Sequence, residues 1–372
     1  MAILLSVFNN KGGVGKTTLT FHLAHALAAL GKRVLMMDLD PQCNLTIYGV
    51  DPEKIADIWL PEDQFIEDYD LSKNSQEINE FEKFVNNPRS IHFILKPTEE
   101  GTAELDKLPP PVKLSKNLDL IPGRLTLHLF EAKVGERWSG VYQGDPLAIR
   151  TATRIRSLAL EYSERNKYDI VILDTSPSLG ALNRNILSLA DAFIIPGGPD
   201  LFSVYGIKNI GNALSTWKKQ FDSIFHFLSD TKRLNFPKRF VRFAGYTLYN
   251  AKKLSGAKST NELDLAKAHY HYAQQMPDVI FQSISRSDML PLNENILKTS
   301  IGENSIIYSH NTFPSQAQKY HAPMWDLPSL INLESEDVTT IKGNRRIYEA
   351  TAVNYKKFAS DLLVRLESLN AD

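Results

Sequence analysis

The stretch Asn-Asn-Lys-Gly-Gly-Val-Gly-Lys-Thr-Thr, residues 9–18, decides the fold class of this chain. It follows the apolar run 2–8 and precedes a segment rich in alanine and leucine. A buried strand, a glycine-rich turn and then a helix form the sequence context of a phosphate-binding loop. The glycines let several backbone N–H groups converge on one anion, and the positive end of the helix adds to the attraction. The stretch therefore predicts a binding site for a nucleoside triphosphate.

Two residues of this loop have roles that follow from triphosphate chemistry. We expect Lys16 to lie against the β- and γ-phosphates and the Thr17 hydroxyl to hold Mg²⁺. The loop departs from the ordinary pattern G-x-x-x-x-G-K-[ST] at its first glycine position, which is Asn10, and an additional lysine, Lys11, follows.

The composition excludes several classes of protein. With 43% hydrophobic and 23% charged residues, the 372-residue chain has the make-up of a globular protein, and its formal charge of −1 indicates no partner. A single cysteine, Cys43, excludes a disulfide framework and a four-thiolate cluster within one chain, and it fits a reducing cytosol. There is no run of about 18 apolar residues and no charged leader, so we expect neither a membrane span nor a signal peptide.

Strand-like apolar runs alternate with helical patterns along the chain. This order predicts an α/β fold, a mainly parallel twisted sheet with helices on both faces, in a single domain over residues 1–372. The expected strands are 2–8, 34–39, 117–121, 168–173, 190–195 and 239–248, with weaker candidates at 279–284 and 305–308. The expected helices include 17–30, 146–165 and a C-terminal helix at about 346–368.

An acidic, partly helical insertion is expected at about 50–116. Its residues 51–107 hold 15 acidic against 6 basic residues, yet apolar side chains recur there, which argues against a disordered segment. The insertion is either a specialised partner surface or a structural elaboration that covers a sheet edge, and the sequence leaves both open.

Three carboxylates follow predicted strands. Asp38 and Asp40 lie two residues apart, on the same side at the end of the second strand, and Asp174 ends the strand 168–173. Ligands bind at this edge of open α/β sheets. One carboxylate of the Asp38–Asp40 pair can support the water shell of a metal while the other positions an attacking water, and Asp174 can hold Mg²⁺ through water or Thr17.

With these elements in order, the chain resembles the ParA/MinD family of P-loop ATPases with a deviant Walker A loop, and the ParA (Soj-like) branch in particular. The resemblance covers about 1–48 and 117–325, and it is most specific in the first 50 residues. It starts at the phosphate loop, so we expect no N-terminal DNA-reading domain. The segments that carry it are Lys-Gly-Gly-Val-Gly-Lys-Thr-Thr (11–18), Asp-Leu-Asp-Pro-Gln-Cys-Asn (38–44), Asn-Leu-Asp-Leu-Ile-Pro-Gly (117–123), Leu-Asp-Thr-Ser-Pro-Ser-Leu-Gly (173–180) and Ala-Asp-Ala-Phe-Ile-Ile-Pro (190–196).

The resemblance implies a weak ATP hydrolase with ATP and Mg²⁺ as cofactors. Lys11 would reach across a homodimer to the partner's phosphates, Asp40 would orient the hydrolytic water, and loss of the γ-phosphate would release the dimer. The expected catalytic residues are Lys11, Lys16 and Asp40. The expected nucleotide-binding residues are Lys11, Gly12, Gly13, Val14, Gly15, Lys16, Thr17 and Thr18, and the expected Mg²⁺ residues are Thr17, Asp38 and Asp174. Asn250, at the end of a predicted strand, is a further nucleotide-binding candidate through adenine, and a structural capping role for it is equally open.

The segment 200–260 is basic and suggests DNA binding. The resemblance implies that ATP dimers hold double-stranded DNA without sequence preference, with contacts expected at Lys252, Lys253 and Arg286; Met289 stands where some relatives are basic. Three acids in the segment face eleven basic residues: Lys208, Lys218, Lys219, Lys232, Arg233, Lys238, Arg239, Arg242, Lys252, Lys253 and Lys258.

Three functions are open at this point. The first is a nucleoid-associated, cytoplasmic partition ATPase for plasmid or chromosome cargo with a ParB-like partner, and the second is a positioning or regulatory ATPase for another cargo or a defence operon. The third is a binding module without turnover, which DNA-stimulated ATP hydrolysis that disappears in Asp40→Ala would exclude. A MinD-like membrane cycler is disfavoured because the C-terminal helix mixes charge signs on its polar face. An iron-protein type of electron-transfer ATPase needs two cluster cysteines, and only Cys43 is present. We expect His22 and His25 to make packing or solvent contacts rather than to bind a metal, and we expect Cys43 to be a small buried residue.

Overall fold

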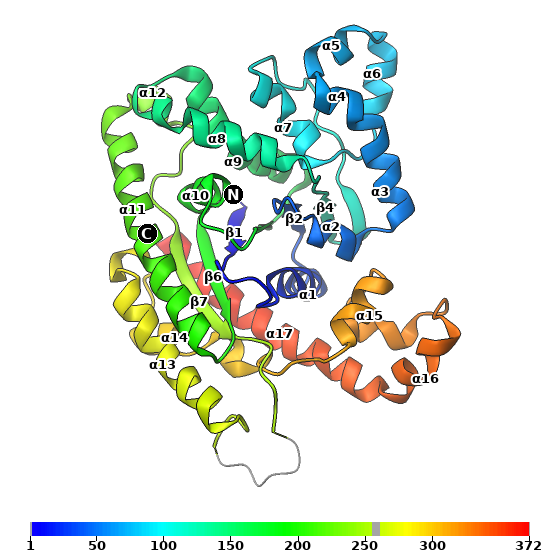
Figure 1. Ribbon diagram of the computed structural model, residues 1–372, viewed down its shortest axis with the longest axis vertical. Helices are drawn as coiled ribbons and strands as arrows, with labels where there is room; N and C mark the ends of the chain where they lie inside the picture. Colours follow the sequence, from blue (N-terminus) through cyan, green and yellow to red (C-terminus); the bar gives the residue numbers. More distant parts are fainter. Residues whose placement is uncertain (1, 255–260, 372) are drawn as a thin grey trace. The chain divides into compact units, whose positions relative to one another are not determined.

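The computed structural model describes residues 2–254 and 261–371 (Figure 1). Seven strands are hydrogen-bonded in the order β3-β4-β2-β5-β1-β6-β7. Only β3 is antiparallel to its neighbour among the pairs β2–β4, β2–β5, β3–β4 and β6–β7. The mainly parallel α/β fold predicted from the sequence is therefore confirmed. The strands are β1 (Ile3–Val7), β2 (Val34–Asp38), β3 (Val112–Ser115), β4 (Leu118–Ile121), β5 (Ile170–Asp174), β6 (Ala192–Gly197) and β7 (Arg242–Leu248).

The chain forms two compact units. Unit 1 holds the start of β1, Lys32–Asp191 and Thr216–Val241, and unit 2 holds Val7–Gly31, Ala192–Ser215 and the chain from Arg242 onward. The long helix α11 (Leu201–Phe227) begins in unit 2 and ends in unit 1. A single domain over the whole chain stays a prediction.

Unit 1 is built on consecutive buried strands. Every residue of β2 and β5 is buried, as expected for parallel strands whose apolar runs are covered on both faces. The register pairs Asp38 with Asp174, so the two carboxylates end neighbouring strands at the same level. The helices of unit 1 are α2 (Asn44–Gly49), α3 (Pro52–Trp59), α4 (Asp63–Glu67), α5 (Tyr69–Asn74), α6 (Ile78–Val85), α7 (Ile91–Glu100), α8 (Leu127–Tyr142), α9 (Pro146–Asn166), α10 (Ala181–Leu189) and α12 (Asp230–Arg233), with the 3-10 turn η1 (Leu60–Glu62).

The insertion is helical and has its own aromatic core. Helices α3 to α7 gather in one group in Figure 1, and Phe65, buried, packs against Phe84 and Phe93 with ring centroids 4.7 and 5.4 Å away. Tyr69 adds a further ring at 6.1 Å from Phe65. Such aromatic packing gives a segment of this size enough buried apolar surface to fold. The segment from α3 to α7 is therefore helical in this structure, while its status as an insertion into a single domain stays a prediction.

Unit 2 combines the phosphate loop with the C-terminal helices. Within it, α17 buries Tyr348, Tyr355, Phe358, Leu362 and Leu366, so the C-terminal helix is docked, as predicted. Among the described residues, no helix is both long and apolar enough to cross a bilayer. The helices of unit 2 are α1 (Lys16–Ala29), α13 (Lys267–Ser283), α14 (Glu294–Lys298), α15 (Phe313–Lys319), α16 (Ser335–Gly343) and α17 (Arg345–Glu367), with the 3-10 turns η2 (Arg286–Asp288), η3 (Ile301–Asn304), η4 (Met324–Ser329) and η5 (Ser368–Ala371).

Two of the weaker strand predictions are wrong. Residues 279–283 belong to α13, because Ala273, Met276 and Ile280 bury one helical face at spacings of three and four. Residues 305–308 follow η3 and make only an isolated bridge between Tyr308 and Ala251. Both segments are rich in β-branched residues, and packing overrides that local preference.

Candidate nucleotide site

The phosphate loop of unit 2 has the backbone that its glycines predict. Gly13 and Gly15 take φ values of 71° and 80°, in the left-handed region that favours glycine. A Cβ on Gly15 would lie 2.4 Å from the ring of Tyr249, so this position also needs glycine for space. Helix α1 begins at Lys16, and its first turn carries no acidic side chain. The positive end of the helix is therefore presented to the loop.

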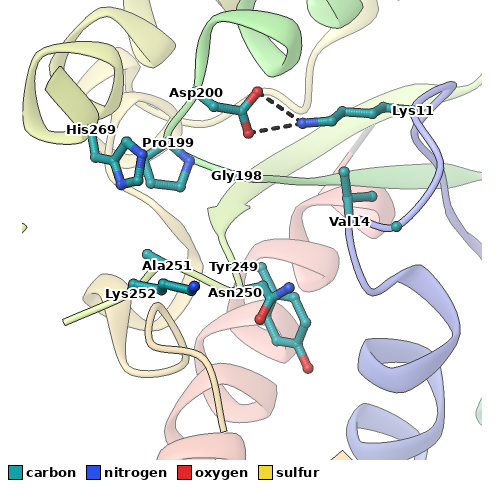
Figure 2. Close-up of a pocket in the computed structure, with 11 residues that line it drawn as sticks. Lys11, Val14, Gly198, Pro199, Asp200, Tyr249, Asn250, Ala251, Lys252 and His269 are labelled. Carbon is teal, nitrogen blue, oxygen red and sulfur yellow. Dashed lines mark hydrogen bonds and ion pairs between the residues drawn. The ribbon is translucent and has the colours of Figure 1, made fainter. Parts of the chain in front are cut away.

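Lys11 is held within its own subunit by Asp200. Its Nζ lies 2.8 and 2.9 Å from the two carboxylate oxygens, as Figure 2 shows, and its side chain is 30% exposed. The carboxylate also accepts a bond from the Ser203 N–H at the start of α11, 2.9 Å away. Partial burial opposes ionisation of Asp200, but the bonds from Lys11 and Ser203 hold the pKa of its carboxyl below the usual value. In this structure the lysine is therefore paired with a carboxylate from the same chain.

Lys16 and Asn9 complete the loop. Lys16 is buried, and its Nζ donates to the Lys11 carbonyl oxygen at 3.2 Å. The Asn9 side chain accepts from the Lys11 N–H at 2.9 Å and donates to the Pro196 carbonyl oxygen at 2.6 Å. Asn9 thus ties the loop to β6 of the same unit. Asn9 and Asp200 were not among the site residues predicted from the sequence, although Asn9 stands directly before the altered glycine position.

A cavity of about 370 Å³ opens beside this loop. Its volume lies within the range that small-molecule sites occupy. Asn250 follows β7 with φ 61° and lines this cavity, as a residue that contacts the base would have to. Lys252 lines the cavity too (Figure 2). The lining residues are Lys11, Gly13, Val14, Gly198, Pro199, Asp200, Tyr249, Asn250, Ala251, Lys252 and His269. Tyr249 and His269 were not predicted from the sequence.

Asp38 is a fully buried carboxylate of unit 1. It has no exposed surface, and its Oδ2 accepts from the Thr46 N–H at 2.8 Å and from the Thr46 hydroxyl at 2.6 Å. Burial raises the pKa of its carboxyl to about 7, against the opposing effect of the Thr46 bonds, and the charge of Asp40 raises the pKa further. A buried carboxylate of this kind favours a nearby cation.

Asp40 and Asp174 lie close by in the same unit. Asp40 is 3% exposed, and its Oδ1 accepts from the Gln42 N–H at 2.9 Å, which orients the carboxylate. The Asp174 carbonyl oxygen accepts from the Leu39 N–H at 3.0 Å. Unit 1 thus brings together the three predicted carboxylates, at the carboxyl ends of β2 and β5. Their roles stay predictions.

Cys43 and His22 behave as buried structural residues. Cys43 has φ 55°, in the region that favours glycine, and burial raises the pKa of its thiol. The His22 ring donates to the Thr18 carbonyl oxygen at 2.7 Å and accepts from the Met324 N–H at 3.1 Å. His25 is half-buried and packs against Phe21. The expected packing of the two histidines and the expected burial of Cys43 are confirmed.

The predicted DNA residues differ in their surroundings. All three are exposed, but Lys253 pairs with Asp264 at 3.2 Å, and Arg286 donates to the carbonyl oxygens of Leu290 and Leu292. Lys252 lines the cavity instead. Lys258 lies outside the described residues.

Comparison with known proteins assigns the family. Residues 2–227 match the family described as "AAA domain". The sporulation initiation inhibitor protein Soj of Bacillus subtilis is 29% identical over 224 residues, 60% of this chain and 69% of Soj. The chain belongs to the ParA/MinD family of P-loop ATPases. An uncharacterised protein of Methanocaldococcus jannaschii is 30% identical over 206 residues, 55% of this chain. The match spans only 62% of that relative's own length.

Solved ParA structures share the fold of this ParA/MinD-family chain. The structure of pNOB8 ParA has a TM-score of 0.58 at 18% identity and covers all of both chains. A second structure, of pNOB8 ParA bound to nonspecific DNA, has a TM-score of 0.52 at 18% identity, covering 99% of each chain. At this identity the likeness concerns the fold alone.

Proposed function

We propose that this ParA/MinD-family protein is an ATP- and Mg²⁺-dependent dimerisation switch that binds duplex DNA without sequence preference and partitions or positions a cargo. One observation supports the proposal: Lys11 lines a cavity of about 370 Å³ beside the phosphate loop, and Lys16 of the same loop begins α1 and donates to the Lys11 carbonyl oxygen. A loop with two lysines and no acid in the first helical turn is suited to a highly charged phosphate group.

The donor set fits Mg²⁺. Asp38 and Asp174 are fully buried carboxylates on paired strands, and a bound cation stabilises buried negative charge of this kind. Thr17, Asp38 and Asp174 would hold the ion, which when bound neutralises charge on the phosphates. Asp40, with its carboxylate oriented by the Gln42 N–H, would position the hydrolytic water. Lys16 would stabilise the charge that develops on the phosphates, and Asn250 would contact the base.

Dimerisation follows from the second lysine. Lys11 is tethered by an ion pair whose two members are 30% and 31% exposed, so the pair can exchange for another anion. In a dimer that anion would be the partner's triphosphate, and hydrolysis would remove the γ-phosphate that both lysines hold.

Support for DNA binding comes from the relative and from surface charge. The pNOB8 ParA structure is of a complex with nonspecific DNA, and Lys252, Lys253 and Arg286 of this chain are exposed cations. Binding of this kind weakens steeply with salt because bound cations are released from the DNA. A ParB-like partner or another cargo adaptor would then stimulate hydrolysis. The insertion has an acidic exterior, which favours a specific adaptor protein that binds this surface. The second candidate function is therefore the positioning of a cargo other than a plasmid.

Sedimentation velocity with ATP, ADP or no nucleotide, each with and without duplex DNA, tests the proposal. We expect a dimer with ATP alone and DNA co-sedimentation only with that dimer. Lys16→Ala is expected to lose both, because the phosphates lose their main cation. A protein that binds ATP but stays monomeric would contradict the dimerisation switch. DNA binding in the absence of ATP would contradict the link between dimerisation and DNA binding.

A further inference from the structure

The insertion is fastened to three consecutive residues, the 122–124 loop that follows β4. The Trp59 indole N–H donates to the Gly123 carbonyl oxygen at 3.0 Å. The Arg124 Nη1 donates to the Trp59 carbonyl oxygen at 2.8 Å, and the Ile91 N–H donates to the Pro122 carbonyl oxygen at 2.7 Å. The insertion therefore holds this loop from the end of α3 and from the start of α7.

A buried ion pair fixes the same contact. Glu62 has no exposed surface and lies 3.2 Å from Arg124 Nη1, while it accepts from the Ser90 N–H and hydroxyl at 2.7 and 2.6 Å. Arg124 also pairs with Asp63. Charge-assisted bonds in such a dry setting demand good geometry, so the pair sets the position of the loop more strictly than a surface pair does.

The loop, in turn, is in contact with Asp38. The Gly123 N–H donates to the Thr46 hydroxyl at 2.6 Å, and that hydroxyl donates to Asp38 Oδ2 at 2.6 Å. A Cβ on Gly123 would lie 2.9 Å from Asp38 Cγ and 3.0 Å from Oδ2. The backbone of the loop therefore packs directly on the carboxylate. A shift of the 122–124 loop by a few tenths of an ångström would therefore change its contact with the Asp38 carboxylate.

We propose that the insertion positions the Asp38 carboxylate, with Trp59 and Arg124 as positioning residues that act through the 122–124 loop and Thr46. The proposal rests on the proposed Mg²⁺-ATP site and adds the means by which this chain controls it. A metal-supporting carboxylate works only when its own partners hold it within about half an ångström of the productive position. The insertion supplies part of that support, so it does more than cover an edge of the sheet.

Trp59→Phe tests the proposal, because it removes the indole N–H and keeps an aromatic ring. We expect the Mg²⁺ concentration for half-maximal ATP hydrolysis to rise and kcat to fall, each by about three- to ten-fold for one lost hydrogen bond. Binding of fluorescent ADP without Mg²⁺ is expected to stay unchanged, because the phosphate loop is not altered. Amide hydrogen exchange of Gly123 and Thr46 is expected to speed up, a readout that does not depend on turnover.

The chain offers a matched control. Among the described residues, the indole nitrogen of Trp138, also in unit 1, has no hydrogen-bond partner, so Trp138→Phe removes an N–H that makes no bond. Trp138→Phe is expected to match the wild type in Mg²⁺ requirement and in exchange at Gly123. Equal behaviour of the Trp59 and Trp138 variants in both readouts would overturn the proposal.

Two more variants cover a failure of folding. If Trp59→Phe is unstable, Arg124→Lys keeps the charge but loses the forked contact, and it is expected to raise the Mg²⁺ requirement in the same direction. Gly123→Ala places a methyl group against Asp38 and is expected to raise the Mg²⁺ requirement more than Trp59→Phe or Arg124→Lys does. Faster exchange in Trp59→Phe together with no ATP hydrolysis in the wild type would support the positioning role and refute the proposed function. Unchanged exchange together with normal hydrolysis in the wild type would refute the positioning role and leave the proposed function standing.

Discussion

Replacing Asp200 with asparagine releases Lys11 without disturbing the helix that follows. Asparagine is nearly isosteric and is as good an N-cap as aspartate, so the bond from the Ser203 N–H at the start of α11 survives. The change removes the charge that holds Lys11 Nζ at 2.8 Å. In the proposed dimer, the wild-type lysine would have to leave this carboxylate before reaching a partner's phosphate, and the variant lysine would not.

The size of the effect follows from the exposure of the pair. Both side chains are about one-third exposed, and ion pairs of this kind contribute about 0.5–1 kcal/mol. A symmetric dimer breaks two such pairs, which gives about 1–2 kcal/mol and a dimer dissociation constant about five- to thirty-fold lower in Asp200→Asn.

Sedimentation velocity over a range of protein concentrations measures this constant, in an Asp40→Ala background that prevents loss of ATP. The double variant Lys11→Ala/Asp200→Asn is the control, and it is expected to stay monomeric because the bridging cation is gone. Equal or weaker dimerisation of Asp200→Asn, with ATP binding intact, would refute the reasoning and show that the pair supports the dimer.

Three other variants test separate parts of the site. Asp40→Ala is expected to reduce ATP hydrolysis by about 100-fold or more, since the water loses its orienting base, and to keep a stable ATP dimer; wild-type phosphate release would exclude the role. Glutamate at Lys252 and Lys253 is expected to lower DNA retention at low salt and to flatten the salt dependence, measured by fluorescence anisotropy; an unchanged slope would place the DNA surface elsewhere. His22, fully buried, has a pKa lowered to about 3 by burial, so the unfolded chain binds the proton more tightly than the folded one. Its contribution to stability is present above pH 6.5 and is lost as the pH falls toward 3, by about 2 kcal/mol at pH 5; in thermal melts, His22→Gln is expected to show a shallower loss of Tm below pH 6.5 than the wild type, and an equal slope would contradict the assignment.

Local patterns predicted the central strands and the phosphate loop well. The strands β2 and β5 are unbroken apolar runs that end in aspartate, and their short length favours a buried strand over a buried helix. The run 279–284 was misread because isoleucine, valine and phenylalanine favour strands, although the helical spacing of Ala273, Met276 and Ile280 was present in the sequence.

Contacts between distant segments could not be predicted. Lys11 and Asp200 are 189 residues apart, and Trp59 and Gly123 are 64 apart. Nothing in the neighbourhood of either residue signals its partner, because both contacts depend on which loops the parallel sheet brings to one edge. Tyr249 was missed for the same reason, since its role depends on a glycine far away in the chain.

Tyr249 connects the phosphate loop to the C-terminal helix α17. The ring packs on Gly15 at the end of the phosphate loop, its hydroxyl lies 2.7 Å from that of Tyr355 on α17, and the next residue, Asn250, lines the cavity. Tyr249 therefore contacts the phosphate loop while its neighbour Asn250 lines the cavity beside it. We expect a ligand in this cavity to shift the tyrosine pair, so the fluorescence of tyrosines near Trp325, 5.7 Å from the Tyr355 ring, would report occupancy without a label.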